Sequence, residues 1–163
     1  MKKLIYTLLM ILAFTSNSFS AGSSSDSGST AKVSDYSKAI NLVKAAKKYE
    51  KKGQTKKAQK RYAKAQKLLL KSNKNKPLQA DTLNYLGFTT RKLGDYEKGE
   101  EFYLQGLQIE PNHNGINEYL GELYVATDRM DMAKGRLEVL KDCNCEEFNE
   151  LKDIIEGKKT SKY

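Results

Sequence analysis

Two cysteines near the end of the chain, Cys143 and Cys145, carry the most reactive side chains in this sequence. Residues separated by one position can have Cα atoms about 5.5–7 Å apart, within or near the range that a disulfide spans. The spacing is compatible with four possibilities: a local disulfide, a disulfide to another chain, a redox pair and a soft-metal thiolate site. A zinc site needs about four ligands, and no spacing connects the only histidine, His113, to the cysteines. We therefore predict no metal site.

Lysines form the second chemically distinctive set. The chain has 29 Lys and Arg against 20 Asp and Glu, a net charge of +9 at pH 7. The excess lies between residues 32 and 76, where Asp35 and Glu50 are the only acidic residues. Five lysines recur there at helical spacing on one face: Lys56, Lys60, Lys64, Lys67 and Lys71. Such a face is either simply solvated or holds an anionic membrane surface or an acidic partner.

Catalytic and nucleic-acid-binding patterns are missing from the sequence. The chain has one histidine, no Ser-His-Asp context and no glycine-rich phosphate-binding loop. Its lysines are not interleaved with a set of base-stacking aromatic residues. We therefore predict a protein that is not an enzyme, needs no cofactor and binds no nucleic acid.

The start of the chain predicts export. A basic start precedes an apolar run over residues 4–14, which is shorter than the roughly 20 residues that span a bilayer. Small residues at Ser18 and Ser20 then match the positions that a signal peptidase inspects, so residues 1–21 are predicted to be a cleaved signal peptide. We predict a periplasmic protein, and in that oxidising compartment a cysteine pair favours a disulfide.

The rest of the chain divides into a linker, one domain and a tail. Residues 22–34 are rich in Ser and Gly and predict a flexible linker. Residues 35–157 show helical periodicity and no alternating strand pattern, which predicts one all-α domain. Residues 158–163 form a basic tail.

The segment from Ala80 to Asn112 resembles one tetratricopeptide repeat. The residues that carry the resemblance are Leu83, Leu86 and Gly87, the turn Gly94-Asp95-Tyr96, then Gly99, Tyr103, Gly106, Leu107 and Pro111. Leu120-Gly121 repeats Leu86-Gly87 after 34 residues, which is the period of this family. The resemblance implies an all-α superhelix of three helix-turn-helix repeats, at about 39–72, 80–113 and 114–147, with a capping helix over 145–157.

The chain also resembles a narrower set, the exported bacterial tetratricopeptide proteins of the alphaproteobacterial kind. The matching residues are 84–88, 91–96, 118–124 and 143–151. Proteins of that set usually have three residues between the two cysteines, whereas here Asn144 alone separates them. The resemblance implies a small scaffold protein and not an enzyme.

The first helix of each tetratricopeptide repeat lines the inner surface of the stack, so the resemblance also implies a concave binding groove. The residues that it places there are Lys44, Lys47, Lys51, Asn84, Phe88, Arg91, Glu118 and Glu122. Such a groove is basic at one end and acidic at the other, with Phe88 as an apolar anchor, and it suits an extended or helical peptide.

We therefore predict a periplasmic scaffold that binds a protein or peptide partner. The alternatives are association of the lysine-rich first repeat with an anionic membrane or wall polymer, and a thiol-redox role for Cys143 and Cys145. The sequence makes no prediction of the oligomeric state.

Overall fold

The computed structural model of the protein describes residues 33–160. This range forms seven α-helices and no strand: α1 (Asp35–Lys51), α2 (Thr55–Asn75), α3 (Ala80–Lys92), α4 (Tyr96–Ile109), α5 (Asn114–Ala126), α6 (Met130–Leu140) and α7 (Glu146–Ile155). None of the helices in this range is long and apolar enough to cross a membrane. The predicted signal peptide, residues 1–21, lies outside the described residues, as does the predicted linker, 22–34, except for its last two residues.

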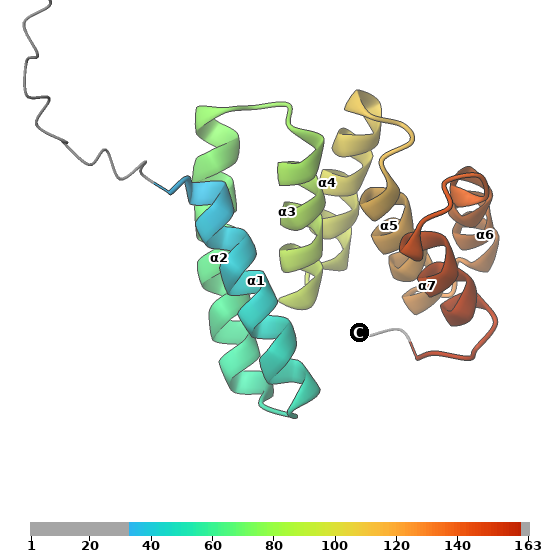
Figure 1. The fold of residues 1–163 in the computed structure, drawn as a ribbon, viewed down its shortest axis with the longest axis horizontal. Helices are drawn as coiled ribbons and strands as arrows, with labels where there is room; N and C mark the ends of the chain where they lie inside the picture. Colours follow the sequence, from blue (N-terminus) through green and yellow to red (C-terminus); the bar gives the residue numbers. More distant parts are fainter. Residues whose placement is uncertain (1–32, 161–163) are drawn as a thin grey trace, which may run out of the picture. The chain divides into compact units, whose positions relative to one another are not determined.

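The helices pack as three consecutive pairs followed by a single helix. The pairs are α1 with α2, α3 with α4 and α5 with α6, and α7 packs on α5 and α6 (Figure 1). The first helices of the pairs also touch in succession, α1 with α3 and α3 with α5. This arrangement confirms the predicted all-α stack of three helix pairs with a capping helix.

The turn inside each pair contains one residue with a left-handed backbone. Gly53 has φ +67°, Gly94 has φ +100° and Asp128 has φ +57°. Glycine adopts this conformation without steric cost, and Asp is one of the few other residues that tolerate it. The same bond closes all three turns: the backbone N–H groups of Gln54, Asp95 and Arg129 donate to the carbonyl oxygens of Tyr49, Thr90 and Tyr124, at N···O distances of 2.9, 3.2 and 2.8 Å. The third pair therefore ends its first helix in the same way as the others, although it lacks the turn glycine.

Close approach between helices depends on the glycines of the two Leu-Gly pairs. A Cβ atom added to Gly87 of α3 would lie 2.5 Å from the ring of Tyr103 in α4. A Cβ atom added to Gly121 of α5 would lie 2.5 Å from Leu151 in α7. Gly87 thus allows close packing inside the second pair, and Gly121 allows the capping helix to pack closely on α5.

Two clusters of buried side chains fill the stack. One joins α1, α2 and α3, and the other joins α4, α5 and α6 with the start of α3. Tyr119 of α5 packs against both clusters. Its side chain therefore connects the two clusters.

Candidate functional site

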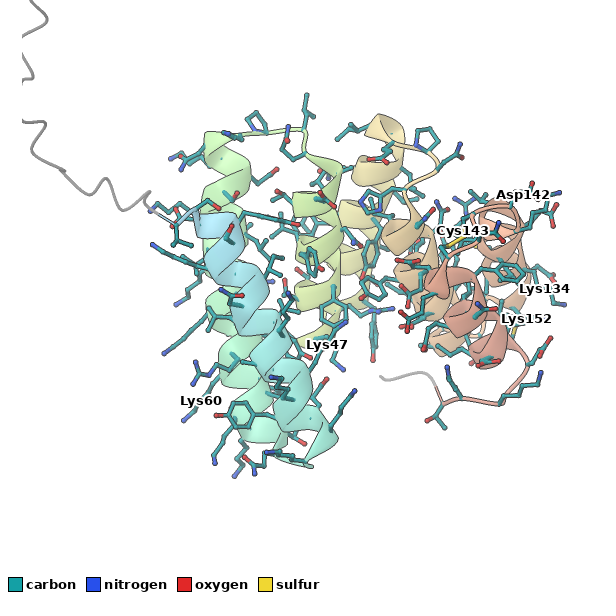
Figure 2. The ribbon with its side chains drawn as sticks, in the orientation of Figure 1. Lys47, Lys60, Lys134, Asp142, Cys143 and Lys152 are labelled. Carbon is teal, nitrogen blue, oxygen red and sulfur yellow. A yellow bond between two sulfur atoms is a disulfide. The ribbon has the colours of Figure 1, made fainter. Side chains whose placement is uncertain are left out.

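Cys143 and Cys145 are joined by a disulfide in the turn between α6 and α7. Their Cα atoms are 5.2 Å apart, and Figure 2 shows Cys143 in this turn. Asn144, between them, has a left-handed backbone with φ +49°. Cys145 is the N-cap residue of α7, so the bond holds the chain in place immediately before the capping helix begins.

Alkylation of the unfolded protein without a reductant should leave its intact mass unchanged, because both sulfur atoms are bonded to each other. Replacing both cysteines with serine should lower the free energy of unfolding by about 1.5 kcal/mol, the chain-entropy value for so short a ring. Urea unfolding measures this difference, and a reductant should remove it by destabilising only the wild type. A mass gain of two alkyl groups without reductant would contradict the pairing.

The eight residues predicted to line the groove differ widely in exposure. Lys44 and Lys51 are exposed on α1, and Lys47 between them is half-buried. The other five are buried: Asn84, Phe88 and Arg91 on α3, and Glu118 and Glu122 on α5. These five are buried where α1, α3 and α5 pack together, whereas the resemblance implied an open groove. Two of them, Asn84 and Glu118, also line a hollow on this side.

Phe88 is covered on several sides and does not form an exposed anchor. Its ring is 5.7 Å from that of Tyr62 and 5.0 Å from that of Tyr119, between ring centroids. Lys47 Nζ lies 4.5 Å from its ring centroid. With 3% of its surface exposed, Phe88 stabilises the junction of α1, α2, α3 and α5.

Arg91 and Glu122 form an ion pair inside the stack. Arg91 Nη2 is 3.2 Å from Glu122 Oε2, and the two side chains are 0% and 1% exposed. Arg91 Nη1 also donates to the carbonyl oxygen of Tyr119, at 2.6 Å. Removing two charges from water is costly unless each is paired and hydrogen-bonded. The ion pair and the hydrogen bond to Tyr119 tie α3 to α5.

Lys47 joins the first pair to the third across Phe88. Its Nζ donates to Tyr119 Oη at 2.9 Å and lies 5.2 Å from the Tyr119 ring centroid. Burial, and then the charge of Glu118, raise the pKa of Tyr119. The phenol therefore stays protonated and neutral, and its oxygen accepts the lysine hydrogen bond.

The inner side of the stack opens into a hollow of about 380 Å³. It is lined by Tyr36 of α1, by α3, by the turn before α5, by α5 and by Glu147 of α7. Of the eight predicted residues, Asn84 and Glu118 line this hollow. The residues that α1, α3 and α5 bring together here are the candidate binding site.

Tyrosines form one wall of the hollow. Tyr36 and Tyr85 meet edge to face, with ring centroids 6.2 Å apart. Burial, and then the nearby Asp81 carboxylate, raise the pKa of Tyr36 to about 12. The same two causes, together with Glu118, raise the pKa of Tyr85. Both hydroxyls therefore remain protonated at neutral pH and are available as hydrogen-bond donors.

His113 fixes the start of α5 at the hollow. Its Nδ1 accepts the backbone N–H of Ile116 at 3.2 Å, which caps the helix. Because Nδ1 accepts, Nε2 carries the proton and donates to Asp81 Oδ1, also at 3.2 Å. The histidine thus connects α5 to α3, a structural role that the sequence did not indicate.

Three tyrosines of the hollow, Tyr36, Tyr85 and Tyr119, were not among the predicted groove residues. A signal for two of them was present, because Tyr85 and Tyr119 stand 34 residues apart, at equivalent positions of successive repeats. Each directly follows a predicted groove residue, Asn84 or Glu118. Within residues 33–160, no three His, Cys, Asp or Glu side chains are grouped so that they could hold a metal ion.

Residues 80–113, which comprise α3, α4 and the turn before α5, match the family model of the tetratricopeptide repeat. No curated protein matches the chain. Among solved structures 45 chains match. One is the first TPR of Spaghetti (RPAP3) bound to HSP90 peptide SRMEEVD, with 21% sequence identity and a TM-score of 0.47 over 76% of this chain and 95% of that chain.

Proposed function

We propose that the protein is a periplasmic, non-enzymatic interaction module that binds a peptide or helix of a partner protein along the inner side of its helix stack. The observation that carries this proposal is the hollow that α1, α3 and α5 line together with the turn before α5. Stacked repeats present such continuous surfaces to extended ligands. The signal-peptide pattern in residues 1–21 supports export, and the Cys143–Cys145 disulfide suits an oxidising compartment.

Exposed lysines continue this surface along α1. Lys44 and Lys51 stand three residues before and four residues after Lys47, so the three share one helix face. Lys47 reaches Tyr119 at the inner side of α5, and Lys44 and Lys51 are exposed beside it. The surface thus offers a basic end on α1 and a polar hollow at the starts of α1, α3 and α5.

Charge reversal on two faces provides the test. Cross-linking first identifies the partner. The double variant Lys44→Glu, Lys51→Glu should then bind this partner with an affinity about tenfold lower, equivalent to about 1.4 kcal/mol. The matched control Lys60→Glu, Lys67→Glu makes the same charge change on α2 and should leave binding within about twofold. Equal losses in both variants, or no loss in the first, would refute binding along the inner side. Phe88 and Arg91 are unsuitable for this test because both are buried.

The exposed face of α2 favours a second function, attachment to an anionic membrane surface. Its five lysines at positions 56, 60, 64, 67 and 71 are exposed, and the helix contains no acidic residue. Of the two acids in the basic segment, Asp35 pairs with Lys71 of this face at 2.9 Å, and Glu50 pairs with Lys92 of α3 at 2.7 Å. Leu70 on the same helix and Leu78 after it are also exposed.

The same two double variants separate this second function from the first. Each lysine near an anionic bilayer contributes about 1 kcal/mol. Lys60→Glu, Lys67→Glu should therefore abolish co-sedimentation with phosphatidylglycerol vesicles at low salt, while Lys44→Glu, Lys51→Glu retains most of it. Failure of the wild type to bind these vesicles at low salt would exclude the membrane function.

A further inference from the structure

The hollow on the inner side of the stack is acidic, although the protein is basic. Four carboxylate side chains line it, those of Asp81, Glu110, Glu118 and Glu147, and among the described residues no lysine or arginine does. The whole chain carries a net charge of +9. A concave site of one sign concentrates ions of the opposite sign, so the hollow favours a cation.

Asn84 gives a second, independent indication of a ligand. The residue is 5% exposed and lines the hollow, and its Oδ1 atom is buried without a hydrogen-bond partner among the described residues. A buried acceptor left unsatisfied costs about 1–3 kcal/mol. A ligand N–H group that reaches this atom would supply the missing donor.

Gly115 leaves room for the amide of Asn84. A Cβ atom on Gly115 would lie 2.8 Å from Asn84 Nδ2, so the glycine at the start of α5 makes space for this side chain. Gly115 also lines the hollow. The buried amide is therefore built into the site by two helices, α3 and α5.

The tyrosines complete a lining that suits an organic cation. Tyr36, Tyr85 and Tyr119 line the same hollow, and tyrosine rings attract ammonium and guanidinium groups within about 6 Å of their centroids. The protein already uses this contact nearby, where Lys47 Nζ lies 5.2 Å from the Tyr119 ring centroid. Aromatic rings, carboxylates and an amide acceptor together match a group that is both cationic and an N–H donor.

We propose that the hollow binds the ammonium or guanidinium group of a lysine or arginine side chain of the partner, through Asn84, the carboxylates and the tyrosines. This inference rests on the proposed function, because the partner supplies the side chain. It gives the bound segment a direction, with its basic residue in the hollow and its acidic residues toward Lys44 and Lys51 on α1.

Two model compounds test the hollow directly. N-acetyl-lysine amide should shift the backbone amide resonances of Asn84 and Gly115 in a saturable way, with a dissociation constant on the order of millimolar. N-acetyl-norleucine amide, which has a similar chain without the charge, should not shift them. Equal shifts with both compounds, no shift with either, or shifts confined to other regions would overturn the proposal.

Matched variants connect the binding to the carboxylates. Asp81→Asn with Glu147→Gln removes two charges from the hollow, and the amide at position 81 keeps an oxygen for the His113 hydrogen bond. This variant should weaken binding of N-acetyl-lysine amide about tenfold. The control Glu101→Gln with Asp131→Asn removes two exposed charges elsewhere and should change it less than about twofold. The same loss in both variants would overturn the proposal.

A displayed library of random peptides separates this inference from the function on which it depends. Selected peptides that are rich in Lys or Arg and bind about tenfold more weakly to Asp81→Asn, Glu147→Gln support both proposals. A second outcome is that the selected peptides bind more weakly to the Lys44→Glu, Lys51→Glu variant but are not enriched in Lys or Arg. This outcome would overturn the inference and leave the proposed function intact. If no peptide is selected, the proposed function fails, and the lysine-amide titration still decides whether the hollow binds a cation.

Discussion

Replacing Arg91 with methionine should destabilise the protein by about 3–5 kcal/mol, because it leaves the Glu122 carboxylate buried without its partner. The two side chains are 0% and 1% exposed, so water cannot replace the lost interaction without opening the stack. The same substitution removes the donor to the Tyr119 carbonyl oxygen. An effect of this size is a large part of the total stability of about 5–15 kcal/mol that is typical of a domain. Urea unfolding followed by far-ultraviolet circular dichroism measures it.

A double-mutant cycle shows whether the loss comes from the ion pair. Arg91→Met together with Glu122→Met should be less destabilising than the sum of the two single variants by at least about 1 kcal/mol, because neither charge is then left alone. Lys98→Met serves as the control, since Lys98 pairs with Glu101 at the surface and such pairs contribute less than about 1 kcal/mol. Additivity of the Arg91 and Glu122 effects within about 0.5 kcal/mol would contradict the coupling.

Replacing Gly87 with alanine should destabilise the protein by about 2 kcal/mol, despite the better helix propensity of alanine. The new Cβ atom would lie 2.5, 2.6 and 2.8 Å from three ring atoms of Tyr103. Tyr103 is itself 0% exposed, so its ring cannot move away without displacing other buried side chains. The expected result is a less stable second helix pair, measurable by thermal and urea unfolding.

Gly135 provides the matched control with the opposite sign. It lies inside α6, and a Cβ atom added there meets nothing within 4 Å. Gly135→Ala should therefore stabilise the protein by about 0.5–1 kcal/mol, the difference in helix propensity alone. If Gly87→Ala also raises the free energy of unfolding, the close contact between Gly87 and Tyr103 does not limit packing.

Local sequence patterns were sufficient to predict the helices and their turns. Helical periodicity and the turn Gly94-Asp95-Tyr96 indicated helix pairs, because periodicity and turn residues act over a few positions. The Leu86-Gly87 pair and its copy 34 residues later indicated that pairs stack. Asp128 stands where the other two pairs have a turn glycine, and it adopts the same left-handed conformation.

The candidate site was only partly predictable from the sequence. Equivalent repeat positions placed Lys47, Asn84 and Glu118 on the inner side of first helices. In the structure Asn84 and Glu118 line the hollow, and Lys47 donates to Tyr119. The same reasoning assigned Phe88 and Arg91 to an open surface, whereas they are 3% and 1% exposed. Exposure on the inner side depends on how closely neighbouring first helices approach, and a repeat pattern carries no information about that distance.

Residue types and spacing by themselves determined that this chain forms stacked helix pairs with a basic first pair and a capping helix, because those features follow from short-range periodicity and composition. Contacts between residues far apart in the chain decided the rest. Lys47 reaches Tyr119 across 72 positions, and Arg91 reaches Glu122 across 31. These contacts close the centre of the inner side around Phe88 and leave the acidic hollow beside Asn84 open. Such pairings arise only when different repeats are packed together, since no single repeat contains both partners.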